Sequence, residues 1–214
     1  MADGFKPHTV PSVSWHHNLP TAKVVGLSAL IFSALYLLSD VIEAVHGGFS
    51  DTQLWMTFVA EAAIPGFVVG LYLLQRPQIR WFGRVGALAY AYAFVFFTGT
   101  VVYAMLNGIG DFNVLSAHLA PWMTIHGAIM VLAGSCFAYA VMTAGVLPRW
   151  TGAALAAGVV MVAASQGLSE PLQLLAAATR DAAFAGMGAA LVGFGPKSGR
   201  NTDAASPISH GLAS

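Results

Sequence analysis

Residues 54 to 75 read LWMTFVAEAAIPGFVVGLYLLQ, an apolar run with a single acid, Glu61, inside it. The run is long enough to cross the hydrocarbon core of a bilayer as a helix, which takes about 20 residues. A carboxyl group in hydrocarbon is costly unless it is neutral or paired, so Glu61 is a candidate functional residue. Pro65 lacks an N–H and pushes against the carbonyl four residues back, that of Glu61, which predicts a kink beside the acid. An ordinary packing kink with a hydrogen-bonded structural acid is the alternative.

The composition of the whole chain agrees with this run. Of its 214 residues, 57% are hydrophobic and 8% are charged, and the mean hydropathy is +0.71. Soluble domains carry about 25% charged residues, so we expect a multi-pass membrane protein. The net charge of zero gives no indication of a nucleic-acid partner. The single cysteine, Cys136, excludes an intrachain disulfide.

Six apolar segments predict an all-α bundle of six transmembrane helices. They are Ala22–Val45, Leu54–Gln75, Gly83–Leu106, Pro121–Leu147, Thr151–Gln166 and Leu172–Phe194. We expect a cytoplasmic N-terminal segment at 1–21, the transmembrane domain at 22–195 and a disordered C-terminal tail at 196–214, where Ser, Asn and Asp are frequent. Ser50 begins a predicted helix cap before the second segment.

The charged loop residues predict the orientation of these segments. On one side of a six-span arrangement lie the basic residues Lys6, Lys23, Arg76, Arg80, Arg84, Arg149, Lys197 and Arg200. The opposite loops hold only Asp51, Asp111 and Glu170. Cytoplasmic loops carry the excess of Lys and Arg, so both termini are predicted to be cytoplasmic.

Charged residues inside the segments are the candidates for chemistry. Counting about 1.5 Å per residue places four acids and one permanent cation in the same outer half of the bundle. These are Asp40, Glu43, Glu61, Asp181 and Arg180. Four ionised carboxylates near one cation are very unfavourable, so we expect at least one carboxyl to be neutral. A neutral acid in an apolar site is a proton donor, and we assign this role to Glu61, with Asp181 and Asp40 as further catalytic residues.

Aromatic residues and a histidine recur at helical spacing near these acids. The predicted supporting residues are Glu43, Trp55, Phe58, Tyr92, Phe96, Tyr103, Trp122, His126 and Arg180. We expect Glu61, His126 and Asp40 to line one cavity together with Arg180 or Asp181. For any single aromatic stripe the alternative is ordinary helix packing, and for His126 it is a hydrogen-bonded core histidine.

Several kinds of chemistry lack their motifs in this sequence. It contains no nucleophile elbow, zinc-ligand spacing, phosphate-binding loop or Asp-rich diphosphate–magnesium motif, so neither a metal nor a cofactor is expected. Protonation of an alkene or epoxide in a lipid-soluble polyene needs only an acid and an apolar cavity with aromatic faces, which stabilise passing cations.

The acids also carry a family resemblance. Glu61 lies in FVAEAAIP in the second segment, and Asp181 lies in ATRDAA in the last. A small membrane protein with acids at these places resembles the integral-membrane terpene cyclases of meroterpenoid and indole-terpenoid biosynthesis, and more closely their short bacterial counterparts that cyclise farnesylated indoles. The fungal members have seven spans, whereas six are predicted here. The resemblance implies acid-initiated cyclisation of a hydrophobic prenylated substrate within the lipid bilayer, in a bacterial-type inner membrane.

Three other functions remain open. A small proton-coupled carrier would use Pro65 and the intramembrane acids, although we see no internal repeat of the kind many carriers show. A b-type haem protein would use His126 as an axial ligand. A regulatory membrane partner would not need the acids. Gly66 and Gly70 have the spacing of a close helix contact, and homo-oligomerisation stays open.

Overall fold

The computed structural model describes residues 19–193, and every regular element in that range is an α-helix. The helices are α1 (Leu19–His46), α2 (Asp51–Leu74), α3 (Trp81–Asn107), α4 (Phe112–Leu119), α5 (Trp122–Ala144), α6 (Arg149–Ala164) and α7 (Glu170–Gly193). The predicted all-α fold is confirmed. The expected tail at 196–214 lies outside the described residues, as does the expected segment 1–21 apart from residues 19–21, which begin α1.

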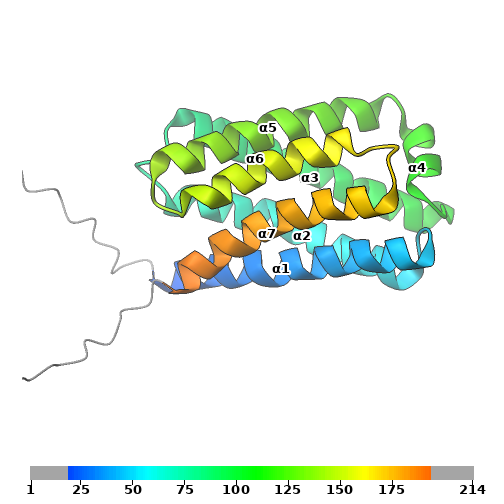
Figure 1. Ribbon diagram of the computed structural model, residues 1–214, viewed down its shortest axis with the longest axis horizontal. Coiled ribbons are helices and arrows are strands. Elements are labelled where there is room, and N and C mark those ends of the chain that lie inside the picture. Colours follow the sequence, from blue (N-terminus) through cyan, green and yellow to red (C-terminus); the bar gives the residue numbers. More distant parts are fainter. Residues whose placement is uncertain (1–18, 194–214) are drawn as a thin grey trace, which may run out of the picture.

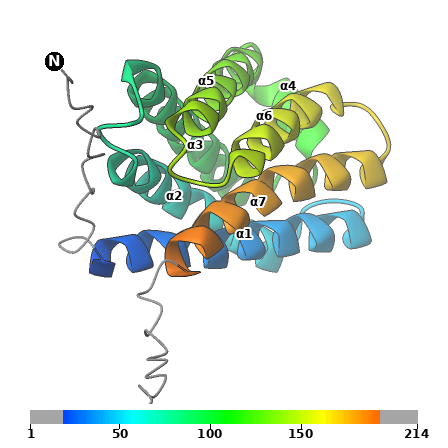
Figure 2. The same ribbon diagram turned by 60° about the vertical axis from the view of Figure 1, so that its left-hand side comes forward.

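The six long helices form a closed ring in chain order. Each packs against its neighbour in the series α1, α2, α3, α5, α6 and α7, and α7 packs back against α1 (Figures 1 and 2). The short α4 lies across one end of the bundle (Figure 1). We name this the α4 end. The first residues of α1 and the last residues of α7 lie together at the opposite end.

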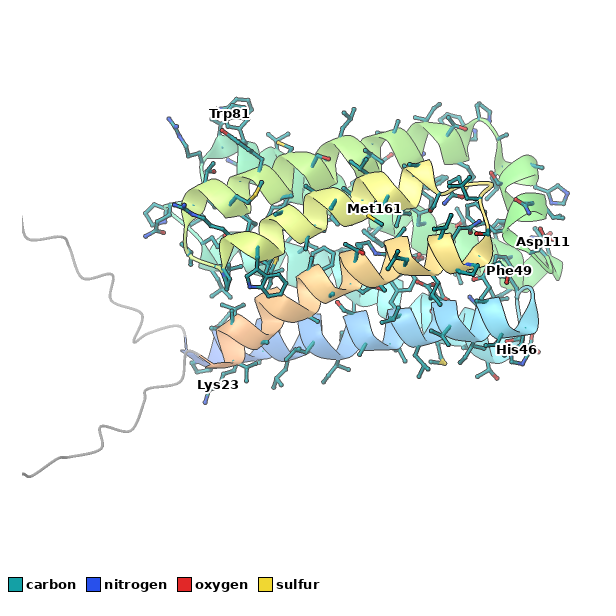
Figure 3. The ribbon with its side chains drawn as sticks, in the orientation of Figure 1. Lys23, His46, Phe49, Trp81, Asp111 and Met161 are labelled. Atoms are coloured by element: carbon teal, nitrogen blue, oxygen red, sulfur yellow. The ribbon has the colours of Figure 1, made fainter. Side chains whose placement is uncertain are left out.

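Charge is divided between the two ends of the bundle. The end opposite α4 carries Lys23, Arg76, Arg80, Arg84 and Arg149, and we name it the basic end. The α4 end carries Glu43, Asp51, Asp111 and Glu170. Figure 3 shows Lys23 and Trp81 at one end and His46 and Asp111 at the other. The helices therefore place the basic and acidic loops on opposite sides, as a charge-based topology requires.

Helix α4 was not predicted, because the stretch between the third and fourth apolar segments was expected to be a loop. Asp111 begins it, since the Asp111 carboxylate accepts a hydrogen bond from Val114 N at 2.9 Å. The buried Leu115 packs with Leu54, Val101 and other apolar side chains at the ends of α2 and α3. Helix α4 thus covers apolar surface that the longer helices leave exposed at this end.

Four of the described helices, α1, α2, α3 and α5, are long and apolar enough to cross a membrane. Helix α6 has only 16 residues. Helix α7 has 24 residues, but Arg180 and Asp181 interrupt its apolar character. Helix α2 continues through Pro65 and begins at the predicted cap, where Ser50 Oγ accepts from Gln53 N at 3.3 Å.

Glycines allow α7 to approach both of its neighbours closely. A Cβ atom added to Gly188 would lie 2.5 Å from the carbonyl oxygen of Gly26 on α1. One added to Gly158 on α6 would lie 2.5 Å from the backbone nitrogen of Arg180. Of the two glycines predicted to pack on α2, only Gly70 meets a neighbour, since a Cβ at Gly66 would have nothing within 4 Å.

Candidate functional site

A cluster of polar side chains joins α1, α2 and α7 in the interior of the bundle. It consists of Tyr36, Asp40, Glu61, Arg180 and Asp181, and we name it the central cluster. The Tyr36 hydroxyl donates to Glu61 Oε1 at 2.5 Å. The guanidinium of Arg180 lies 4.4 Å from the centre of the Tyr36 ring, a cation–π contact. Tyr36 therefore connects the acid on α2 with the cation on α7.

Arg180 is paired with two carboxylates. Its Nε donates to Asp181 Oδ1 at 3.0 Å and its Nη2 to Asp181 Oδ2 at 3.3 Å, a two-point contact between buried groups. Nη2 also lies 3.8 Å from Asp40 Oδ2 on α1. A buried ion pair persists when its charges are matched and hydrogen-bonded. Asp181 alone already balances the single cation, and Glu61 forms no ion pair with any described residue.

Glu61 is the acid that this arrangement leaves without a cation. Its side chain is buried, and the residue is 4% exposed. Oε1 accepts from Tyr36, whereas Oε2 has no hydrogen-bond partner among the described residues. An unpaired carboxylate in an apolar interior is far more costly than a neutral carboxyl group. Oε2 is thus the oxygen placed to carry a proton.

Buried aromatic rings surround the central cluster. The Tyr36 ring packs edge-to-face on Phe94, and Phe94 packs in the same way on Tyr90, with centroids 6.5 and 5.1 Å apart. Phe184 lies 6.1 Å from Tyr90 and 5.3 Å from Phe67. The hydroxyl of Tyr90 is buried and has no partner among the described residues. Four helices thus contribute rings to the apolar surroundings of the acid.

A second set of polar side chains leads from the α4 end toward the central cluster. Gln53 Nε2 donates to Glu43 Oε2 and to Thr57 Oγ1, each at 3.0 Å. Thr57 Oγ1 lies 3.1 Å from Ser39 Oγ, and Ser39 donates to the backbone carbonyl of Tyr36 at 2.7 Å. Glu43, Gln53, Thr57 and Ser39 form what we name the polar chain. Glu43 therefore contacts Gln53, and no described hydrogen bond or ion pair joins it to Glu61.

His126 lies elsewhere, between α3 and α5. Its Nδ1 is 2.9 Å from the carbonyl oxygen of Trp122, so Nδ1 carries a hydrogen and Nε2 accepts from the Tyr92 hydroxyl at 3.1 Å. The ring stacks on Phe96 with centroids 3.6 Å apart. No described hydrogen bond, ion pair or ring contact joins His126 to Glu61. The structure does not bring His126 into the expected common cavity.

The two faces of α3 explain this separation. Residues two apart on a helix point in nearly opposite directions, so Tyr90 and Phe94 face the core while Tyr92 and Phe96 face α5 and the outside. Tyr92 is 55% exposed, and Tyr103 is also exposed. Because α3 is apolar on every side, its spacing alone does not show which face is inward.

The predicted tryptophans lie at the surface of the bundle. Trp55 and Trp122 are more than half exposed at the α4 end, and Trp81 and Trp150 are equally exposed at the basic end. Phe58 packs against Trp55 and the apolar residues beneath α4. Exposed tryptophans at both ends of a bundle are typical of membrane interfaces. Trp55 and Trp122 are therefore surface residues in this structure.

Sequence reasoning did not single out Tyr36, Tyr90 or Phe94 for the site. The signals for them were weak, namely Tyr36 four residues before Asp40 and Tyr90 four residues before Phe94. Among the described residues, no group of three or more His, Cys, Asp or Glu is placed to hold a metal ion. Comparisons of the chain with protein family models, curated proteins and solved structures find no match. The function is therefore argued from the geometry of the site.

Proposed function

We propose that this protein is a six-span membrane enzyme with both termini in the cytoplasm, in which Glu61 protonates an alkene or epoxide of a prenylated aromatic substrate. Protonation starts a cationic cyclisation. The observation that carries this proposal is Glu61 Oε2, a buried carboxyl oxygen without a partner among the described residues, on an acid that Tyr36 contacts. Acid, apolar surroundings and ring faces are the parts that such a reaction needs.

The proton balance of this reaction closes without a co-reactant. The Oε2–H proton forms a C–H bond with the alkene, or an O–H bond with the epoxide oxygen, and leaves a carbocation. Further double bonds of the substrate attack the cation, and the final cation loses a proton from carbon to the Glu61 carboxylate, directly or through water, which restores the acid. The product is an isomer of the substrate. The Tyr36 hydroxyl, which donates to Oε1, stabilises the Glu61 carboxylate that remains after the first step.

Arg180 and its two acids are assigned a positioning role. The cation over the Tyr36 ring and its pairing with Asp181 and Asp40 hold Tyr36 against Glu61. Tyr36 contacts the acid, and the ring of Phe94 packs edge-to-face on Tyr36 in this conformation. Substrate binding therefore requires these rings to move aside, which also brings their faces against the cation.

The test compares Glu61→Gln with Glu43→Gln in membranes given a farnesylated indole or its terminal epoxide. Loss of a general acid typically costs about 10²–10⁴-fold in rate, so Glu61→Gln should lose that much of the isomeric cyclised product measured by mass spectrometry. Glu43→Gln changes an acid that does not contact Glu61 and should retain most activity. Both proteins should elute as the wild type does in detergent. Undiminished cyclisation by Glu61→Gln would reject the assignment of the acid.

A second function, a proton-coupled carrier, is favoured by the polar chain. Hydroxyl, amide and carboxyl groups extend from Glu43 at the α4 end to Ser39, next to the central cluster. A carrier needs such access between the buried acid and water. Reconstituted vesicles distinguish the two functions. Solute-driven proton uptake that Glu61→Gln abolishes, with no cyclised product from a broad panel of prenylated substrates, would favour the carrier.

The haem alternative receives no support from the contacts of His126. Both ring nitrogens are engaged, Nδ1 with Trp122 and Nε2 with Tyr92. Iron binding at Nε2 would have to replace the Tyr92 hydrogen bond. An absorbance spectrum of the purified protein tests this directly, since a Soret band would revive the haem function.

A further inference from the structure

A hollow of about 300 Å³ lies at the basic end, between the last turn of α2 and the first turn of α3. Arg76, Arg80 and Arg84 line it together with Tyr72 and Trp81. It is separate from the central cluster, whose residues do not line it. The hollow therefore needs an explanation other than the proposed chemistry at Glu61.

The three arginines around this hollow have no acidic partners within residues 19–193. None of them forms an ion pair with a described residue, and the segment from Gln75 to Gly110 contains no Asp or Glu. The positive end of the α3 helix dipole adds to the same field. Three guanidinium groups around one hollow create a strongly positive site, and a planar guanidinium binds phosphate oxygens through two parallel hydrogen bonds.

Aromatic residues place this hollow at the depth of lipid headgroups. Trp81 stacks on Phe82 with ring centroids 3.9 Å apart, and both rings are exposed. Exposed tryptophan beside a polar helix end is typical of the membrane–water interface. Clusters of arginine beside a membrane-spanning helix bind anionic lipid headgroups. The size of the hollow, its positive charge and its depth therefore all suit an anionic lipid headgroup.

We propose that the hollow formed by Arg76, Arg80 and Arg84 binds the phosphate of an anionic phospholipid headgroup. Trp81 and Tyr72 pack against the headgroup at the sides. The recognised chemistry is a phosphate ester, which a lipid or a soluble molecule can supply. The proposal rests on the membrane placement of the bundle and does not depend on cyclisation at Glu61.

The test measures lipid binding to the purified protein in detergent by native mass spectrometry. Phosphatidylglycerol is the anionic probe, phosphatidylcholine the probe without net charge, and glycerol phosphate the soluble phosphate ester. The wild type should bind phosphatidylglycerol at least about tenfold more tightly than phosphatidylcholine, and added salt should weaken that binding. Each of Arg76→Gln, Arg80→Gln and Arg84→Gln should weaken it by about fivefold.

Arg149→Gln is the matched control, because Arg149 lies at the same end of the bundle but does not line the hollow. It should bind phosphatidylglycerol as the wild type does, and so should Glu61→Gln, which separates this proposal from the one on cyclisation. Competition by glycerol phosphate would identify a soluble ester as the source, and its absence would identify the lipid.

The proposal is overturned if phosphatidylcholine binds as tightly as phosphatidylglycerol. It is equally overturned if the three variants retain wild-type binding, or if Arg149→Gln weakens binding as much as they do. Each variant carries one substitution, and its lipid binding is measured separately, so the test does not depend on a combined variant that folds poorly. Melting of each variant without added lipid checks that the fold is retained.

Discussion

Tyr36 is the residue that connects the two halves of the central cluster. Its hydroxyl donates a hydrogen bond to Glu61, and its ring makes a cation–π contact with the guanidinium of Arg180. The two contacts use different parts of one side chain. Substitutions can therefore separate the role of the hydroxyl from the role of the ring.

Tyr36→Phe should keep the contact with Arg180 and lose the hydrogen bond to Glu61. Side-chain hydrogen bonds within membranes contribute about 0.6–2 kcal/mol, so the free energy of unfolding should fall by that amount. Cyclisation should slow as well, because the carboxylate formed at Glu61 loses its donor. Unfolding in mixed micelles and the product assay measure the two effects. Tyr36→Leu should be less stable than Tyr36→Phe, and equal stability would contradict the role of the ring.

The two acids that pair with Arg180 should differ in their effect on stability. Asp181 makes two short contacts with the guanidinium, whereas Asp40 makes one of 3.8 Å from a side chain that is 22% exposed. Removing one partner of a buried ion pair costs about 3–5 kcal/mol. Asp181→Asn should approach that loss, and Asp40→Asn should cost clearly less. Unfolding of both variants under the same conditions checks the order, and a larger loss for Asp40→Asn would contradict it.

Close glycine contacts determine how the helices pack. Gly188→Ala places a Cβ 2.5 Å from the carbonyl oxygen of Gly26, so α1 and α7 must move apart. Overpacking of this kind typically costs about 1–3 kcal/mol. Gly66→Ala is the control, because its Cβ meets nothing within 4 Å and alanine favours a helix over glycine by about 0.8–1 kcal/mol. Unfolding measurements should show a loss for the first variant only.

The long helices were predicted well, and the short one was not. The predicted segment Ala22–Val45 corresponds to α1 at Leu19–His46, and Thr151–Gln166 corresponds to α6 at Arg149–Ala164. Apolar runs of this length have few alternatives to a helix. Helix α4 is stabilised by covering Leu54 and Val101, which are distant in sequence from Leu115. A pattern read along the chain does not contain that contact.

The charged residues of the central cluster were predicted from the sequence, but its aromatic residues were not. Glu61, Asp40, Arg180 and Asp181 stand out because charged residues are rare in apolar segments, and the structure brings these four together. Aromatic residues are common in such segments, and their inward or outward direction depends on packing. This is why Tyr92, Phe96 and Trp122 pack against His126 and not in the central cluster.

At the scale of the whole molecule, the proposed topology is testable with single cysteines in a Cys136→Ala background. A cysteine at Gly110, at the α4 end, should react with an impermeant reagent added to intact cells. A cysteine at Gln78, in the loop at the basic end, should react only after permeabilisation. We expect this pattern because the basic loop residues, which are typical of the cytoplasmic side, lie at the end that holds Gln78, and the acidic ones lie at the end that holds Gly110. The reverse pattern would overturn the proposed orientation.

In the proposed six-span arrangement, the shortness of α6 has a consequence for the surrounding membrane. Its 16 residues span only about 24 Å, less than the roughly 30 Å of a typical hydrocarbon core. Such a hydrophobic mismatch is relieved by local thinning of the bilayer. Gly158, which touches the backbone of Arg180, lies only about 9 Å along the axis from the last residue of α6. On this side of the ring, lipid headgroups and their hydration water come nearest to the level of Arg180 and Asp181.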